Sequence, residues 1–322
     1  MKFVFLMDPL HMVIMEKDTS FILMLGARRR GHQIFFVPDG GLTLKDGQLI
    51  FHAEEIVPQE MKTAPFQIKG TLDLAAGDVD AVFIRNDPPF DEQYLLNTWL
   101  LEHFAPNIPM VNNPAGIRTV NEKIWAARFN DLIPPTLIGR KYALLKEFLQ
   151  KYQEIIVKPT NSYGGQSVFY VKSGDRNVNV IFETLTAGYS RDIILQKFIP
   201  ESREGDKRII LLNGEALGAV LRLHSEEDHR NNFFAGGKPH AAEISARERQ
   251  IIAALKPHLR RLGLYFVGID VIGEYLIEVN VTSPTCLQEI NHLTGRHLED
   301  KVIEFVENLT KNFSKGGFHE RT

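Results

Sequence analysis

The sequence predicts an α/β protein in which an N-terminal open parallel α/β domain precedes two α+β subdomains. Apolar strands alternate with helices at the start of the chain, and beyond Asn121 the strands are closely spaced and joined by glycine turns. A chain of 322 residues can hold two or three domains of about 100 to 150 residues. We expect domains at 1–120, 121–200 and 201–315, followed by a tail at 316–322.

The first domain opens with a β-α-β pattern. A buried strand at Lys2–Met7 is followed by a helix that Asp18 or Thr19 begins and Arg30 ends, and by a strand at Gln33–Val37. Later segments of the same kind are a strand at 81–85, a helix at 92–104 and a strand at 108–111. Ligands of such sheets bind beyond the carboxyl ends of the strands. Arg85 closes a strand there, which favours binding of a substrate carboxylate over a plain surface charge.

The second domain begins with N-E-K-I-W, which predicts a new helix carrying Lys123. A helix at 146–152 and strands at 154–157 and 168–171 follow, and the turn between the strands contains Gly164 and Gly165. Glycines let main-chain amides approach an anion, and Lys158 at the end of a strand supplies a fixed positive charge. The sequence therefore predicts an anion-binding loop.

A strand at 193–199 ends the second domain. The third domain begins with strands at 209–212 and 215–221, with Asn213-Gly214 as a tight hairpin turn. The segment 223–238 then predicts a lid loop. A helix at 246–262 precedes the final hairpin, and a helix at 297–312 follows it. His224, His229 and His240 match no metal-ligand spacing, so we do not expect them to bind a metal.

The hairpin at 267–285 carries three polar residues where core side chains are expected, namely Asp270, Glu278 and Asn280. Glu278 and Asn280 are two residues apart and therefore share one face of a strand. Buried carboxylates of this kind need a compensating cation, and oxygen ligands suit Mg²⁺ together with substrate phosphates. The alternative is an edge hairpin whose acidic residues face water.

The length of the turn decides whether the two carboxylates meet. A two-residue loop at Gly273 and Glu274 would pair Asp270 with Ile277, whereas a three-residue loop, Gly273 to Tyr275, pairs Asp270 with Glu278. We predict the three-residue loop.

Composition excludes several classes of protein. A hydrophobic content of 44% and a charged content of 24% are those of an ordinary globular chain. A net charge of −3 with scattered Lys and Arg argues against nucleic-acid binding. We expect no signal peptide and no membrane partner. The single cysteine, Cys286, fits a reducing compartment, so we expect a cytoplasmic protein with an unreactive structural thiol.

In their order along the chain, Lys123, Lys158, the Gly164-Gly165 loop and the three hairpin ligands resemble the elements of the ATP-grasp carboxylate-amine ligases. Over nearly its whole length, the chain more closely resembles the bacterial glutathione synthetases. The matching motifs are M-D-P, K-D-T-S at 17–20, R-N-D-P-P-F-D at 85–91, N-E-K at 121–123 and E-V-N-V-T-S-P-T-C at 278–286.

This resemblance implies ATP-dependent joining of γ-glutamylcysteine to glycine through an acyl phosphate, with Mg²⁺, or alternatively Mn²⁺, as the metal. It also implies a homotetramer. The resemblance assigns a role to each motif. In the nucleotide site, the phosphates would be held by Lys123, Lys158, Gly164 and Gly165, the adenine by Gln196, Lys197, Phe198 and Ile199, and the ribose by Asp206. The metal would be bound by Asp270, Glu278 and Asn280, and the reaction centre would contain Arg208 and Arg222. The dipeptide would be bound by Arg85, Arg230 and Asn232, and the glycine by Thr282 and Ser283.

Three positions depart from the family pattern. Asn161 and Ser162 replace an aspartate and a glycine of the phosphate loop, and Asn86 replaces a lysine. Two other functions therefore stay open: a ligase for another carboxylate and amine, and a non-catalytic ATP-binding protein similar to the synapsins. No residue is assigned as a general base.

Overall fold

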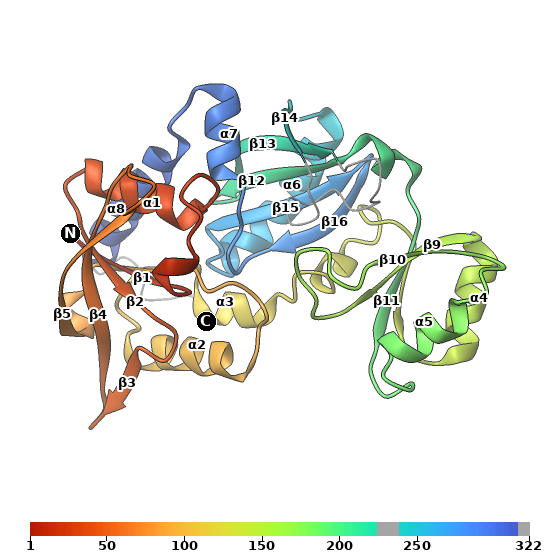
Figure 1. Cartoon of the computed structure of the whole chain (residues 1–322), viewed down its shortest axis with the longest axis horizontal. Coiled ribbons are helices and arrows are strands. Elements are labelled where there is room, and N and C mark those ends of the chain that lie inside the picture. Colours follow the sequence, from red (N-terminus) through yellow and green to blue (C-terminus); the bar gives the residue numbers. More distant parts are fainter. Residues whose placement is uncertain (224–237, 315–322) are drawn as a thin grey trace.

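The computed structural model describes residues 1–223 and 238–314 and forms three β-sheets with eight α-helices in these ranges (Figure 1). The predicted α/β class is confirmed. The predicted lid, with Arg230 and Asn232, lies outside the described residues, as does the tail at 316–322.

The first sheet has seven strands, in the order β3-β4-β2-β1-β6-β7 with β5 paired to β4. The parallel strands are β1 (Lys2–Leu6), β2 (Gln33–Val37), β6 (Ala81–Ile84) and β7 (Met110–Val111). Helix α1 (Thr19–Arg29) begins at Asp18, whose side chain accepts a hydrogen bond from the main-chain N of Phe21. The predicted helix at 92–104 is α2 (Glu92–Phe104), and α3 (Pro114–Thr119) packs against it.

Three antiparallel strands extend this sheet and were not predicted. They are β3 (Leu42–Lys45), β4 (Gln48–Pro58) and β5 (Phe66–Ala75). The sheet is therefore mixed rather than wholly parallel. Nearly all of β5 is exposed, so its residues lack the apolar alternation from which a strand is predicted.

The second sheet has the order β10-β9-β11-β8 and is antiparallel throughout (Figure 1). Its strands are β8 (Thr136–Gly139), β9 (Glu154–Pro159), β10 (Phe169–Lys172) and β11 (Ile193–Lys197). Helices α4 (Tyr142–Tyr152) and α5 (Val178–Leu185) share a separate apolar core with these strands. The helix predicted at N-E-K-I-W is wrong: Lys123 lies in a turn, followed only by the short 3-10 helix η3 (Trp125–Arg128).

The third sheet has the order β14-β13-β12-β15-β16. Its strands are β12 (Asp206–Leu212), β13 (Glu215–Leu223), β14 (Lys238–Ala241), β15 (Phe266–Ile272) and β16 (Tyr275–Asn280). Helix α6 (Ala246–Arg261) begins at Ser245, which forms a capping box with Glu248. Its buried face, including Ile251 and Leu255, joins the core of this sheet.

The β15-β16 hairpin confirms the predicted pairing of Asp270 with Glu278 but not the predicted loop. Ile272 pairs with Tyr275, so the loop has two residues, and Val271 pairs with Leu276. Ile277 is then an extra residue, and this β-bulge shifts the register so that the carboxylates face each other.

Helix α7 (Leu287–Thr294) contacts β13, β14 and α1, and the last described helix, α8 (Leu298–Ser314), returns to the N-terminal part of the chain (Figure 1). Helix α8 packs on α1, where Arg29 is paired with Glu299 and Arg30 Nη2 lies 2.7 Å from Glu307 Oε2. Arg29 and Arg30 therefore join the end of α1 to the C-terminal helix. None of the described helices is long and apolar enough to cross a membrane.

Candidate active site

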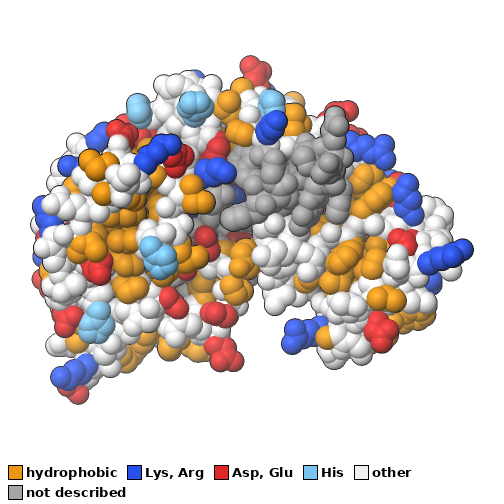
Figure 2. Space-filling model, viewed as in Figure 1, with side chains coloured by type: hydrophobic (Ala, Val, Ile, Leu, Met, Phe, Trp, Pro, Cys, Tyr) orange, Lys and Arg blue, Asp and Glu red, His pale blue; other side chains and the backbone are white. Residues whose placement is uncertain are grey.

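A cleft lies between the second and third sheets, and the predicted nucleotide and metal residues line it. Figure 2 shows basic and acidic side chains interspersed over the coloured surface of the molecule. The predicted residues found in the cleft lining are Lys123, Lys158, Gly164, Gly165, Gln196, Lys197, Phe198, Ile199, Asp206, Arg208, Arg222, Asp270, Glu278, Asn280, Thr282 and Ser283. Of the described site residues, Arg85 is the exception.

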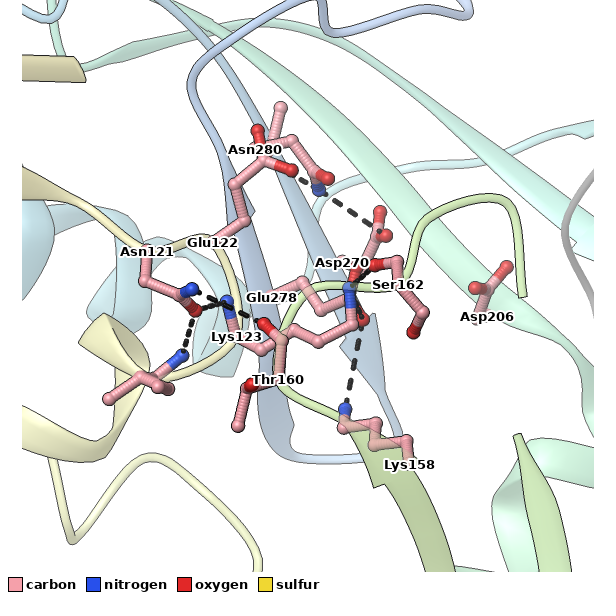
Figure 3. Close-up of polar contacts among 12 residues, drawn as sticks. Asn121, Glu122, Lys123, Lys158, Thr160, Ser162, Asp206, Asp270, Glu278 and Asn280 are labelled. Atoms are coloured by element: carbon pink, nitrogen blue, oxygen red, sulfur yellow. Dashed lines mark hydrogen bonds and ion pairs between the residues drawn. The ribbon is translucent and has the colours of Figure 1, made fainter. Parts of the chain in front are cut away.

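Two lysines approach one carboxylate oxygen on the cleft floor (Figure 3). Glu278 Oε1 lies 3.6 Å from Lys123 Nζ and 3.7 Å from Lys158 Nζ. Both lysine side chains are buried, at 8% and 5% exposed. Burial lowers the pKa of Lys158, and Glu278 opposes that shift. Two lysines share one carboxylate, so a net positive charge remains in this partly buried part of the cleft. Such a charge suits the phosphates of a nucleotide.

The glycine loop lies beside these lysines. Gly164 and Gly165 both have positive φ, at 60° and 74°, which L side chains rarely adopt. Lys123 Nζ donates to the main-chain oxygen of Ser162 (Figure 3). The position that departs from the family pattern therefore contacts Lys123 through its main chain, which any residue type can supply.

Asp270 is held by two arginines. Arg208 lies directly opposite it on β12 and donates from Nε and, at 2.8 Å, from Nη2. Arg222 Nη2 lies 3.1 Å from Asp270 Oδ1. Burial opposes ionisation of Asp270, but the two guanidinium charges outweigh it and lower the pKa of the carboxyl. Asp270 is therefore a carboxylate at neutral pH.

Arg222 also binds Asp206 across the β12-β13 pair. Its Nε and Nη2 donate to the two Asp206 oxygens at 2.7 and 2.5 Å. Burial raises the pKa of Asp206 despite the nearby Arg222. The predicted ribose ligand and one predicted reaction-centre arginine thus contact each other directly.

The three predicted metal ligands converge. Asp270 lies opposite Glu278, and Asn280 Nδ2 lies 3.5 Å from Asp270 Oδ2. No group of three His, Cys, Asp or Glu side chains forms a metal site within 1–223 and 238–314. Two carboxylates and one amide fit Mg²⁺, because this ion takes one or two protein carboxylates and completes its shell with phosphate and water oxygens.

The predicted adenine segment runs along the end of β11. Gln196 and Ile199 are buried, and Gln196 Nε2 donates to Thr136 Oγ1 at 3.1 Å. Ile272 and the bulge residue Ile277 line the cleft with them. The cleft therefore offers apolar side chains and a strand end to a flat heterocycle.

Arg85 lies behind the cleft wall and is only 3% exposed. Its Nε donates to Ser20 Oγ at 2.9 Å and its Nη2 donates to the main-chain oxygen of Pro284 at 3.1 Å. Within the described ranges its Nη1 has no hydrogen-bond partner. Burial lowers the pKa of Arg85. The guanidinium thus joins the first sheet to the segment after β16.

Glu122 was missed by the sequence analysis, although it lies in the cleft lining. Its Oε1 accepts hydrogen bonds from the main-chain N of Val281 and from both N and Oγ1 of Thr282. The neighbouring Ser283 hydroxyl bonds Asp87 and opposes the burial that raises the pKa of that carboxyl. The only available signal was the position of Glu122 inside N-E-K, because its partners lie about 160 residues later.

Comparison with known proteins covers both halves of the chain. The family described as "Prokaryotic glutathione synthetase, N-terminal domain" matches residues 1–118, and "Prokaryotic glutathione synthetase, ATP-grasp domain" matches residues 122–295. A glutathione synthetase from Xanthomonas axonopodis pv. citri is 39% identical over 306 residues, covering 94% of this chain and 97% of the relative. One from Synechocystis is 39% identical over 317 residues, covering 95% and 99%.

Solved structures share the fold at low identity. The macrocyclase MdnC from Microcystis aeruginosa, bound to its precursor peptide MdnA, superposes with a TM-score of 0.67 at 14% identity, covering 96% of this chain and 100% of that one. The D-cycloserine synthetase DcsG gives 0.65 at 14% identity, covering 97% and 99%. At this identity the likeness concerns the fold alone.

Proposed function

Because the chain belongs to the family of prokaryotic glutathione synthetases, we propose that its cleft joins γ-glutamylcysteine to glycine, with conversion of ATP to ADP and phosphate. The chain is an ATP-dependent ligase of the ATP-grasp fold. One observation carries the proposal: two buried lysines, two arginines and three oxygen-bearing side chains line one cleft between two sheets.

Phosphoryl transfer to a carboxylate brings two anions together, so their charges must be screened. We assign phosphate binding to Lys123, Lys158 and the Gly164-Gly165 loop. Arg208 and Arg222 would stabilise the transferring phosphoryl group and then the tetrahedral intermediate. The bond between the γ-phosphorus and ADP breaks as the cysteine carboxylate oxygen bonds phosphorus. The glycine nitrogen then attacks the acyl carbon, loses a proton, and phosphate leaves.

We propose that Asp270, Glu278 and Asn280 hold Mg²⁺, or Mn²⁺ in its place. Support comes from the ionised state of Asp270 and the all-oxygen ligand set that the three side chains can present. When bound, the ion would neutralise phosphate charge. Because the two arginines already contact Asp270, the chain's own cations compensate that carboxylate when no metal is present.

We assign adenine to Gln196–Ile199 and ribose to Asp206, supported by their places in the cleft lining. The dipeptide carboxylates are assigned to Arg85, together with Arg230 and Asn232 of the segment outside the described residues. The glycine carboxylate is assigned to the Thr282–Ser283 segment. The domain division at 120 and 200 stays a proposal, as do the cytoplasmic location and the homotetramer, both of which rest on the family.

The test is a phosphate-release assay on the purified protein. With ATP and γ-glutamylcysteine we expect rapid phosphate release only when glycine is added, with glutathione formed in equal amount. Release with alanine but not glycine would show a ligase for another amine. Tight ATP binding without turnover would favour a non-catalytic role.

A further inference from the structure

One carboxylate holds the end of β16 in place. Glu122 Oε1 accepts from Val281 N at 2.9 Å, from Thr282 N at 3.1 Å and from Thr282 Oγ1 at 2.9 Å. The main-chain oxygen of Glu122 also accepts from Val279 N at 2.9 Å. Glu122 therefore accepts four hydrogen bonds, and these fix the chain on both sides of Asn280.

The neighbours of Glu122 reach the other wall of the cleft (Figure 3). Asn121 Nδ2 donates to the main-chain oxygen of Thr160 at 3.2 Å, and Asn121 Oδ1 accepts from the main-chain N of Lys123 at 3.1 Å. Lys123 itself reaches Ser162 and Glu278. The segment 121–123 thus connects the start of the glycine loop to the hairpin that carries the carboxylates.

We propose that Glu122 is a positioning residue, which holds Asn280 and Thr282 in the conformation that the metal and the amine substrate require. This rests on the proposed function. Val279 and Val281 flank Asn280, and both donate to Glu122, so the main chain that carries Asn280 is fixed. From that position Asn280 Nδ2 lies 3.3 Å from the main-chain oxygen of Gly268 and 3.5 Å from Asp270 Oδ2. The main-chain N and the hydroxyl of Thr282 both donate to Glu122, so Glu122 sets the orientation of this assigned glycine-binding segment.

Groups that orient metal ligands change metal affinity or activity by about 10- to 100-fold when they are replaced. The variant Glu122→Gln keeps the size of the side chain and removes the charge that attracts three donors. We expect it to weaken Mn²⁺ binding to the protein with a non-hydrolysable ATP analogue by that factor. The measurement is an electron paramagnetic resonance titration of free Mn²⁺. Thr282→Val, which removes one donor of the three, should give a smaller change in the same direction.

Glu248→Gln is the matched control. Like Glu122, Glu248 accepts a hydrogen bond from the main chain, at Ser245 N. Its carboxylate is buried and also pairs with Lys207, but it does not line the cleft. It should lower the melting temperature and leave Mn²⁺ affinity within twofold of the unchanged protein. The proposal fails if Glu122→Gln also stays within twofold, or if Glu248→Gln loosens Mn²⁺ equally. Failure of the proposed function looks different: the unchanged protein would bind Mn²⁺ and nucleotide but form no glutathione.

Discussion

Arg208 and Asp270 lie directly opposite each other on β12 and β15, and the guanidinium donates two hydrogen bonds to the carboxylate. Both side chains are buried, at 9% and 7% exposed. The carboxylate that the proposed function assigns to the metal is therefore already compensated by a cation. Removing Asp270 would take away the buried carboxylate that both Arg208 and Arg222 contact.

Asp270→Asn should lower the free energy of unfolding by about 3–5 kcal/mol, because it breaks a buried ion pair, and should reduce ligase turnover by about 100-fold or more. Urea unfolding and ADP release measure the two effects. The double variant Arg208→Met, Asp270→Leu should recover most of the stability and none of the turnover. Recovery of activity in the double variant would contradict the roles assigned to both residues.

Lys158→Met should weaken binding of a non-hydrolysable ATP analogue by about 10- to 100-fold, since a hydrogen bond to a charged group contributes about 1.5–3 kcal/mol. Titration calorimetry measures the dissociation constant. Lys172→Met serves as control. Lys172 lies on β10, which pairs with the strand that carries Lys158, but its side chain is 58% exposed and forms an ion pair with Glu154. Equal affinity in both variants would remove Lys158 from the nucleotide site.

Glu307 gives a pH dependence of known sign. Its hydrogen bond from Arg30, together with His32, lowers its pKa from 4.5 to about 2. A carboxyl whose pKa is lower in the folded state contributes stability fully above its unfolded pKa and loses it as pH falls. The difference in unfolding free energy between the unchanged protein and Glu307→Gln should be constant above about pH 5.5 and shrink as the pH falls from 4.5 to about 2. A difference that grows on acidification would oppose this.

Cys286 should behave as an inert thiol. It is 1% exposed, and burial raises its pKa, so little thiolate forms near neutral pH. Iodoacetamide at pH 7.5 should leave the native protein unmodified and active, while one thiol should react in urea. Loss of activity at the rate of alkylation would show that the thiol is accessible during turnover.

Helix caps and apolar runs in the sequence predicted those helices and strands whose formation depends mainly on neighbouring residues. The Asp18 cap, α1 and the β1-β2 pair follow from capping chemistry and apolar runs. The pairing of Asp270 with Glu278 was right for the wrong reason: a two-residue turn and a bulge at Ile277 produce the register that a three-residue turn was expected to give. A bulge depends on packing, and the sequence of the hairpin carries no separate signal for it.

Features that depend on distant partners were missed. Arg208 and Arg222 were assigned to the reaction centre by resemblance, but their ion pairs with Asp270, and the hydrogen bonds of Glu122, join segments far apart in sequence and were not predicted. The strand β5 was missed because it is almost fully exposed and, among the described strands, pairs only with β4. At Lys123 the structure has a turn in place of the predicted helix. Asn121 Oδ1 accepts hydrogen bonds from the main-chain N of Lys123 and Ile124, as in a helix N-cap, but only the short η3 follows.

The packing of α8 on α1 has a consequence for biosynthesis. During translation the first sheet emerges from the ribosome long before Ile303 and Val306, which belong to the same apolar core as Met24 and Phe83. Until those residues emerge, the α1 side of that sheet lacks its last covering layer, so a nascent or prematurely terminated chain would present an apolar surface that chaperones recognise.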